Sequence, residues 1–321
     1  MAGKRADIDL SASFAGLRLK NPVIAASGTF GYGTEYEKLI PARAFGAIVT
    51  KTITLAPRAG NAPPRLCETP SGMLNSIGLA NVGVDAFLKE KLPALENSGA
   101  VVIANIAGDT VDEYVALARR LSRAPFLSAL EINISCPNVS HGGVPARRSV
   151  FRHAGVAFGA DPRVAAALTR AVKKAAKLPV IVKLSPNVSD IAAIARAVAS
   201  AGADALSLIN TLYGMAIDIE RQRPALGNVT GGLSGPAVKP VALYNVFKAC
   251  QAVKIPVIGL GGIATASDAI EFLLAGAVAV QIGTATFVDP RTVRAINDGI
   301  ADYCRAHGLS RAAEITGGLA L

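Results

Sequence analysis

The apolar residues of this chain gather in short runs rich in valine, isoleucine and alanine, each bounded by glycine, proline, asparagine or serine. Runs that are apolar at every position are typical of strands buried on both faces of a parallel sheet. The pattern predicts eight such strands, at residues 22–26, 47–50, 101–105, 129–134, 180–184, 205–209, 256–260 and 277–282.

Stretches with helical periodicity follow nearly all of these runs. The clearest lie at residues 84–97, 111–122, 162–176, 190–201, 237–253, 266–274 and 290–306. A length of 321 residues leaves one or two domains open, but no linker or change in composition divides the chain. Eight strand-helix repeats predict a (β/α)8 TIM barrel, an α/β fold that residues 1–321 form as a single domain.

Three segments lie outside this repeat. Residues 8–19, with Gly16 among them, alternate like a small hairpin, which we expect to cover the bottom of the barrel. Two connections, at residues 51–99 and 210–235, are long. Long loops inside a compact domain are usually functional, so we expect both to contribute to function.

Composition and charge narrow the class of protein. Apolar residues make up 51% of the chain and charged residues 17%, which excludes a disordered protein. A net charge of +10 can indicate nucleic-acid binding, but the basic residues of this chain are scattered and are not interleaved with aromatic ones. The charge therefore indicates a solvated surface that favours small anionic ligands.

The cysteines and the N-terminus indicate a compartment. Cys67, Cys136, Cys250 and Cys304 lack C-x-x-C spacing, so we expect neither a metal site nor an iron–sulfur cluster in this chain. No apolar run reaches the roughly 18 residues of a membrane span, and residues 1–9 form no signal-peptide core. These features predict a cytoplasmic protein.

Polar and glycine residues follow the C-terminal ends of the predicted strands, where TIM barrels build their active sites. Glycine-rich segments at residues 259–263 and 283–284 offer backbone N–H groups to a phosphate, although the same glycines also suit simple tight turns. Their spacing differs from the G-x-G-x-x-G of a dinucleotide-binding unit, which disfavours a nicotinamide site in this chain.

Two lysines end predicted strands. A lysine in the position of Lys51 or Lys183 can stabilise the negative charge that the edge of a flavin ring gains on reduction. The alternative is that both lysines reach outward to solvent at the rim of the barrel.

One cysteine carries candidate chemistry. Cys136 lies on a proline-stiffened segment with Asn133 and Asn138, whose amides can bind a planar polar ligand, and its thiolate can act as a base. The alternative is that a lone cysteine is simply a small, buried apolar residue. We adopt this interpretation for Cys250 and Cys304.

In these motifs the sequence resembles the dihydroorotate dehydrogenases over nearly its whole length. The matching segments are NPVIAASG at 21–28, KTIT at 51–54, MLNSIGLAN at 73–81, NISCPNV at 133–139, VKLSPN at 182–187, NT at 210–211, GLSGPA at 232–237, GLGGI at 259–263 and QIGT at 281–284.

The resemblance implies that the chain binds FMN and oxidises dihydroorotate to orotate for pyrimidine (UMP) synthesis. It assigns to Cys136 the removal of the C5 proton, while the C6 hydride passes to flavin N5. The residues it assigns to FMN are Ser27, Lys51, Thr52, Asn105, Asn133, Lys183, Ile209, Gly235, Gly261, Gly262, Gly283 and Thr284. The residues it assigns to dihydroorotate are Lys51, Asn75, Ser76, Ile77, Gly78, Leu79, Asn133, Asn210 and Thr211.

Within the family, a cysteine as base favours the soluble class 1, as does the lack of a membrane-binding N-terminal extension. The segments NVSHGG at 138–143, MAID at 215–218 and LGN at 226–228 resemble the NAD-linked class 1B catalytic subunit. This implies a homodimer that joins an electron-transfer subunit, carrying FAD and a [2Fe-2S] cluster, in a heterotetramer. A fumarate-reducing class 1A enzyme, a non-catalytic flavin-binding electron-transfer subunit and a phosphate-binding lyase without flavin stay open as alternatives.

Residues 144–155 depart from the family, whose members pass almost directly from His-Gly-Gly to Ala-Phe-Gly. The insertion lengthens the segment that carries Cys136. We hypothesise that it modifies the lid or the partner-docking surface; the alternative is a tolerated surface insertion.

Overall fold

The computed structural model describes residues 7–134 and 155–321. Eight parallel strands close into a barrel in the order β10-β15-β16-β3-β4-β7-β8-β9, which confirms the (β/α)8 fold and all eight predicted strands. The strands are β3 (Val23–Ala25), β4 (Ala47–Val49), β7 (Val101–Ile106), β8 (Leu127–Asn133), β9 (Val180–Leu184), β10 (Ala205–Leu208), β15 (Val257–Leu260) and β16 (Ala279–Ile282).

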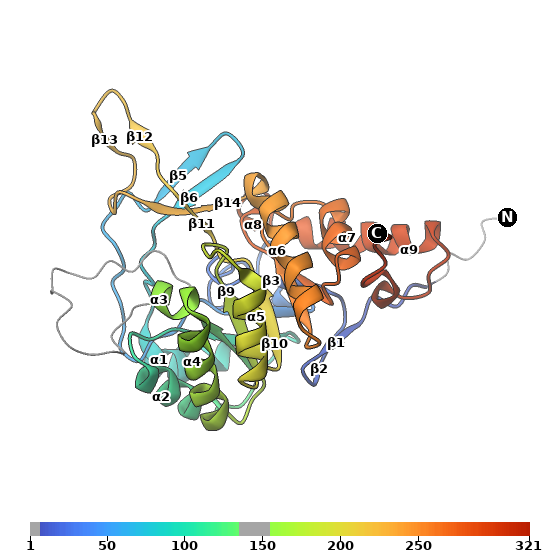
Figure 1. The fold of residues 1–321 in the computed structure, drawn as a ribbon, viewed down its shortest axis with the longest axis horizontal. Helices are drawn as coiled ribbons and strands as arrows, with labels where there is room; N and C mark the ends of the chain where they lie inside the picture. The colour runs from blue at the N-terminus through green and yellow to red at the C-terminus, as the bar shows by residue number, and fades with distance from the viewer. Residues whose placement is uncertain (1–6, 135–154) are drawn as a thin grey trace.

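Helices cover the outside of this barrel (Figure 1). The longer ones are α2 (Val111–Leu121), α4 (Pro162–Ala175), α5 (Ile191–Ser200), α6 (Lys239–Ala252), α7 (Ala266–Leu274) and α9 (Thr292–Ala306). Local sequence sets their starts: Thr265 and Asp268 form a reciprocal capping box at the N-terminus of α7, and the side chain of Asp190 accepts hydrogen bonds at the N-terminus of α5. Within the described ranges, no helix has the length and apolar composition needed to cross a membrane.

One predicted helix is irregular. The stretch at 84–97 is divided into α1 (Gly83–Ala86), the π-helical η2 (Phe87–Lys91) and the 3-10 helix η3 (Pro93–Leu95). Pro93 has no N–H to donate, so a regular helix cannot continue through it. Two short helices, α3 (Gly155–Ala160) and α8 (Ala285–Val288), are not among the sequence-based expectations.

An N-terminal hairpin closes one end of the barrel. Its strands β1 (Ala12–Phe14) and β2 (Leu17–Leu19) are antiparallel and turn through Gly16, whose φ of +77° suits glycine. Phe14, Leu17 and Leu19 pack in one cluster with inward-facing barrel residues such as Ile103 and Ile181. The expectation that this hairpin covers the bottom of the barrel is confirmed.

The two long connections meet at the opposite end. Strands β5 (Leu66–Thr69) and β6 (Gly72–Asn75) from the first join β11 (Leu212–Gly214) and β14 (Gly231–Ser234) from the second in a sheet ordered β11-β14-β6-β5. This sheet lies at the top of Figure 1, with the small hairpin β12 (Ile217–Asp218) and β13 (Arg223–Pro224) beyond it. Segments about 150 residues apart therefore form one wall over the C-terminal ends of the barrel strands.

The inward-facing side chains change from apolar to polar along the barrel. On β7 the buried Ile103 is followed two positions later by Asn105, and on β9 Ile181 is followed by Lys183. Because side chains on one face of a strand recur at every second position, both polar groups point into the barrel interior. The polar layer therefore lies toward the C-terminal ends of the strands.

Candidate functional site

A cavity of about 490 Å³ opens between the C-terminal ends of the barrel strands and the four-stranded sheet. It brings together residues from both long connections and from the ends of strands across the barrel. Those among them that the family resemblance assigned to a ligand are Ser27, Lys51, Thr52, Asn75, Ile77, Gly78, Leu79, Asn133, Lys183, Ile209, Asn210, Thr211, Gly235, Gly261, Gly262, Gly283 and Thr284.

Two of the assigned residues do not line this cavity. Asn105 is fully buried and lies in the barrel interior, where its side chain donates to Glu131. Ser76 is also fully buried, and its hydroxyl accepts a hydrogen bond of 2.8 Å from the amide of Asn61. Any effect of Asn105 or Ser76 on a ligand in this cavity is therefore exerted through neighbouring residues.

One wall of the cavity is built from glycines in conformations that other residues avoid. Gly261 has φ +124° and Gly262 has φ +77°, and a Cβ on Gly262 would lie 2.7 Å from the backbone nitrogen of Lys239. Both glycines therefore provide tight turns and also let the chain pass close to its neighbours. The ammonium of Lys239, on α6, donates 2.8 Å hydrogen bonds to Asp268 and Glu271 on α7, which tie these two helices together beside the glycine loop.

The end of the eighth strand lies beside the same wall. The hydroxyl of Thr284 donates a 2.8 Å hydrogen bond to the hydroxyl of Ser234, on the sheet that covers the barrel. Gly235, the next residue, has φ +93°, and a Cβ there would lie 2.6 Å from Gly72. Small residues and hydroxyl groups thus meet where an anionic group of a ligand can approach the backbone.

The floor of the cavity is polar and charged. Lys183 is 5% exposed and its ammonium lies 3.8 Å from the carboxylate of the fully buried Glu131. The interpretation that Lys183 reaches outward to solvent is therefore wrong. Lys51 is partly exposed on the cavity wall, and its backbone N–H donates to the carbonyl of Gly31 at 2.7 Å.

Three assigned polar residues form one chain of hydrogen bonds at the cavity. The amide of Asn210 donates to Oδ1 of Asn133 at 3.2 Å, and Oδ1 of Asn210 accepts from the N–H of Thr211 at 2.8 Å. The backbone carbonyl of Asn133 accepts from the hydroxyl of Tyr114 at 2.7 Å. These contacts fix which face of each amide is presented to a ligand.

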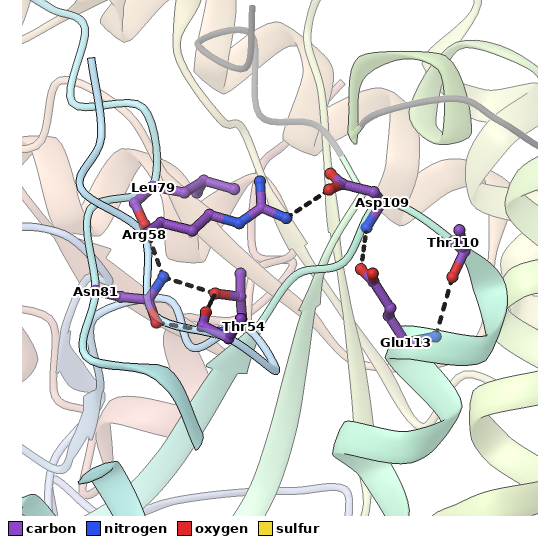
Figure 2. A network of polar contacts seen from close by, with 8 residues as sticks. Thr54, Arg58, Leu79, Asn81, Asp109, Thr110 and Glu113 are labelled. Carbon is purple, nitrogen blue, oxygen red and sulfur yellow. Dashed lines mark hydrogen bonds and ion pairs between the residues drawn. The ribbon is translucent and has the colours of Figure 1, made fainter. Parts of the chain in front are cut away.

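Polar contacts also hold the loop that contains residues 75–79 (Figure 2). The amide nitrogen of Asn81 donates to the hydroxyl of Thr54 and to the carbonyl of Leu79, both at 2.8 Å. Nearby, Arg58 forms an ion pair of 2.8 Å with Asp109, which follows β7. Segments after β4 and β7 are thereby tied together, and the conformation of Leu79, with φ +57°, is maintained.

Several expectations fall on residues that the structure does not describe. Cys136, Asn138 and most of the insertion at 144–155 lie outside the described ranges, and their roles stay predictions. Cys304 is fully buried, as expected from the sequence. Cys250 is only partly buried where it packs against the core, and burial raises the pKa of its thiol to about 12. Cys67 is partly exposed on β5.

Sequence reasoning assigned no role to three residues of the barrel interior. Glu131 and Ser207 are fully buried on β8 and β10, and Gln281, on β16, lines the cavity. The sequence held a clue, because a glutamate in the middle of an otherwise buried strand is costly unless it has partners.

The residues present fit a flat, polar-edged ring that carries a phosphate. Within the described part of the chain, Gln281 Oε1 is buried and accepts no hydrogen bond, and Gln281 lines the cavity, so the floor holds an acceptor for a ligand N–H group. Gly261, Gly262 and Gly283 line one side of the cavity, where backbone N–H groups suit a phosphate, and Ile77, Ile209 and Leu260 supply apolar surface. FMN has this combination of a polar ring edge, an apolar ring face and a phosphate.

Comparisons with known proteins give a consistent result. A family model described as dihydroorotate dehydrogenase matches residues 9–303. A protein of Geotalea daltonii named "Dihydroorotate dehydrogenase B (NAD(+)), catalytic subunit" is 52% identical over 97% of this chain and 98% of its own length. A protein of Geobacter sulfurreducens with the same name is 54% identical over the same shares. The crystal structure of a DHODH from Eimeria tenella in complex with ferulenol has a TM-score of 0.80 at 23% identity, covering 98% of this chain and 90% of that one, and supports the fold alone.

Proposed function

This chain belongs to the dihydroorotate dehydrogenase family, and from that premise we propose that it oxidises dihydroorotate to orotate with bound FMN. The observation that carries the proposal is the cavity, in which nearly all residues that the sequence assigned to cofactor and substrate meet. The names of relatives at 52% and 54% identity support the same activity.

FMN would lie with its phosphate at Gly261, Gly262, Gly283 and Thr284, which line the cavity at the ends of the seventh and eighth barrel strands. The polar edge of the ring would face Lys183, whose positive charge suits an edge that gains electrons. When bound, FMN supplies the acceptor for the hydride that leaves C6 of dihydroorotate.

Dihydroorotate would be bound by Lys51, by the segment from Asn75 to Leu79, and by Asn133, Asn210 and Thr211. The ammonium of Lys51 suits the substrate carboxylate, and amides held in one orientation suit a ring with alternating donors and acceptors. Cys136 would remove the proton from C5 as its thiolate. The wall formed by β6 and β14 would keep water from the reacting atoms.

A partner subunit completes the proposed reaction. The relatives are named catalytic subunits of NAD-linked enzymes, which supports a complex in which electrons leave this chain for a subunit carrying FAD and a [2Fe-2S] cluster. We propose a homodimer of this chain within a heterotetramer.

The free thiols of the described cysteines agree with a reducing compartment such as the cytoplasm.

The proposal is tested by purifying the chain alone. We expect about one FMN per chain and orotate formation from dihydroorotate with an artificial electron acceptor. A colourless protein that binds no added FMN, or a flavoprotein that forms no orotate with any acceptor, would contradict it.

A further inference from the structure

The carboxylate of Glu131 is the centre of the polar layer inside the barrel. The side chain is fully buried. Its Oε1 accepts a 2.7 Å hydrogen bond from the amide of Asn105, and its Oε2 accepts bonds of 2.9 Å from Ser207 and 2.8 Å from Gln281. The ammonium of Lys183 lies 3.8 Å from Oε1. Partners from four other strands thus converge on one acid.

A buried ionised group is unfavourable for folding unless partners compensate for its lost hydration, and apolar side chains of similar size are often as stable. The layer of the barrel beneath Glu131 is apolar and includes Ile103, Ile181 and Ile258. Packing alone therefore does not require an acid at this level. Its contacts indicate a role in the cavity directly above.

Glu131 determines how two carboxamides are oriented. A carboxylate only accepts hydrogen bonds, so the amide nitrogens of Asn105 and Gln281 must face it. Their oxygens are turned elsewhere: across the described ranges, Asn105 Oδ1 and Gln281 Oε1 are buried without a donor. Gln281 lines the cavity, as does Lys183. The floor thus presents a cation and an acceptor whose orientations both depend on one acid.

We propose that Glu131 is a positioning residue for the polar edge of the FMN ring. It holds the Lys183 ammonium toward a ring carbonyl oxygen and turns the Gln281 carbonyl toward a ring N–H, which matches the mixture of acceptors and donors on that edge. Its negative charge also balances Lys183, so that the cation does not act on the ring uncompensated. This inference rests on the proposed binding of FMN.

The decisive variant is Glu131→Gln, which keeps the size of the side chain and removes its charge. The carboxamide of the new glutamine has an N–H group that would face side chains which themselves donate, so the arrangement around it is disturbed. We therefore expect the dissociation constant for FMN to rise at least about tenfold. The uncompensated Lys183 should stabilise the negative charge of the reduced ring and move the flavin midpoint potential to a more positive value. Glu131→Asp keeps the charge and should return the potential toward that of the wild type.

The control is the same glutamate-to-glutamine substitution at a position on the protein surface. Glu314→Gln also removes one negative charge, but Glu314 is exposed, accepts a hydrogen bond from Ser310 and is not among the residues that line the cavity. It should leave FMN affinity and potential unchanged. A folded Glu131→Gln protein with wild-type affinity and potential would overturn the inference.

A second variant decides the matter if Glu131→Gln does not fold. Gln281→Met removes the carbonyl acceptor while Asn105, Ser207 and Lys183 still surround Glu131. We expect FMN affinity to fall about tenfold; unchanged affinity would overturn the inference. Failure of the wild-type chain to bind FMN would instead contradict the proposed function itself.

Discussion

The side-chain amide of Asn210 donates a 3.2 Å hydrogen bond to the side-chain carbonyl of Asn133, a residue 77 positions earlier in the chain. The contact joins the end of β8 to the segment after β10 at the mouth of the barrel. Because Oδ1 of Asn210 is already occupied by the N–H of Thr211, neither amide can rotate freely. Two residues assigned to the substrate are therefore oriented before any ligand arrives.

Asn210→Ala should weaken substrate binding more than cofactor binding. The change removes the donor to Asn133 and leaves the N–H of Thr211 without its acceptor. We expect KM for dihydroorotate to rise about tenfold, the effect of losing one or two oriented hydrogen bonds. Steady-state kinetics and the flavin content of the purified variant provide the measurement. A large loss of FMN with unchanged KM would contradict this assignment.

Cys136→Ala should abolish turnover and leave FMN bound. General-base catalysis contributes about 10²-fold to 10⁴-fold, so kcat should fall within or beyond that range. The matched control is Cys250→Ala, because burial raises the pKa of that thiol to about 12 and little thiolate exists at neutral pH. If Cys136→Ala keeps wild-type kcat, another group is the base.

Gly262→Ala should damage the cofactor site through backbone strain. The alanine Cβ would lie 2.7 Å from the backbone nitrogen of Lys239, and the φ of +77° alone costs about 1–2 kcal/mol for a non-glycine residue. We expect weaker FMN binding and a lower free energy of unfolding. The control is Gly308→Ala, where φ is +69° and no atom lies within 4 Å of the new Cβ. That variant should lose stability but keep its FMN affinity.

Asp268→Asn should reveal a pH-dependent contribution to stability. Burial raises the pKa of Asp268, but hydrogen bonds from Lys239 and from the backbone of Ala264 and Thr265 outweigh it and hold the pKa below its usual value. The ionised carboxylate therefore stabilises the fold above that usual pKa, and its contribution is lost as the pH falls through the lower pKa of the folded state.

At pH 7 the variant should lose about 2 kcal/mol of unfolding free energy, as expected for hydrogen bonds to a charged group. The difference from the wild type should shrink as the pH falls below about 4, near the usual pKa of an aspartate. Chemical denaturation at several pH values measures this. Asp302→Asn, which removes an exposed ion pair with Arg305, should change little at any pH.

The barrel could be predicted from the sequence because its signal is local. A strand such as β3 (Val23–Ala25) is apolar at every position and follows a proline, and α7 (Ala266–Leu274) begins at a capping box visible in the sequence. The sheet formed by β6 and β14 was not predicted. Its strands are three or four residues long, and the contact of Asn75 with Gly232 joins segments 157 positions apart.

The candidate site likewise contains residues that could be predicted from the sequence and one that could not. Residues at strand ends could be recognised as candidates because every parallel strand of a barrel ends at the same rim, and the resemblance to the family assigned them to FMN or dihydroorotate. Glu131 could not be given a role, since its partners Ser207 and Gln281 face it only once the barrel closes, 76 and 150 positions away. The orientation of their side chains depends on register across the sheet, which a single sequence does not contain.

The most direct test of the account is orotate formation from dihydroorotate by the purified chain, assayed with NAD, with fumarate and with an artificial acceptor. Each assay is run with and without an added subunit that carries FAD and a [2Fe-2S] cluster. We predict orotate with the artificial acceptor alone, and orotate with matching NADH only when the subunit is present. Vigorous reduction of fumarate by the isolated chain, or no orotate under any condition, would contradict the account.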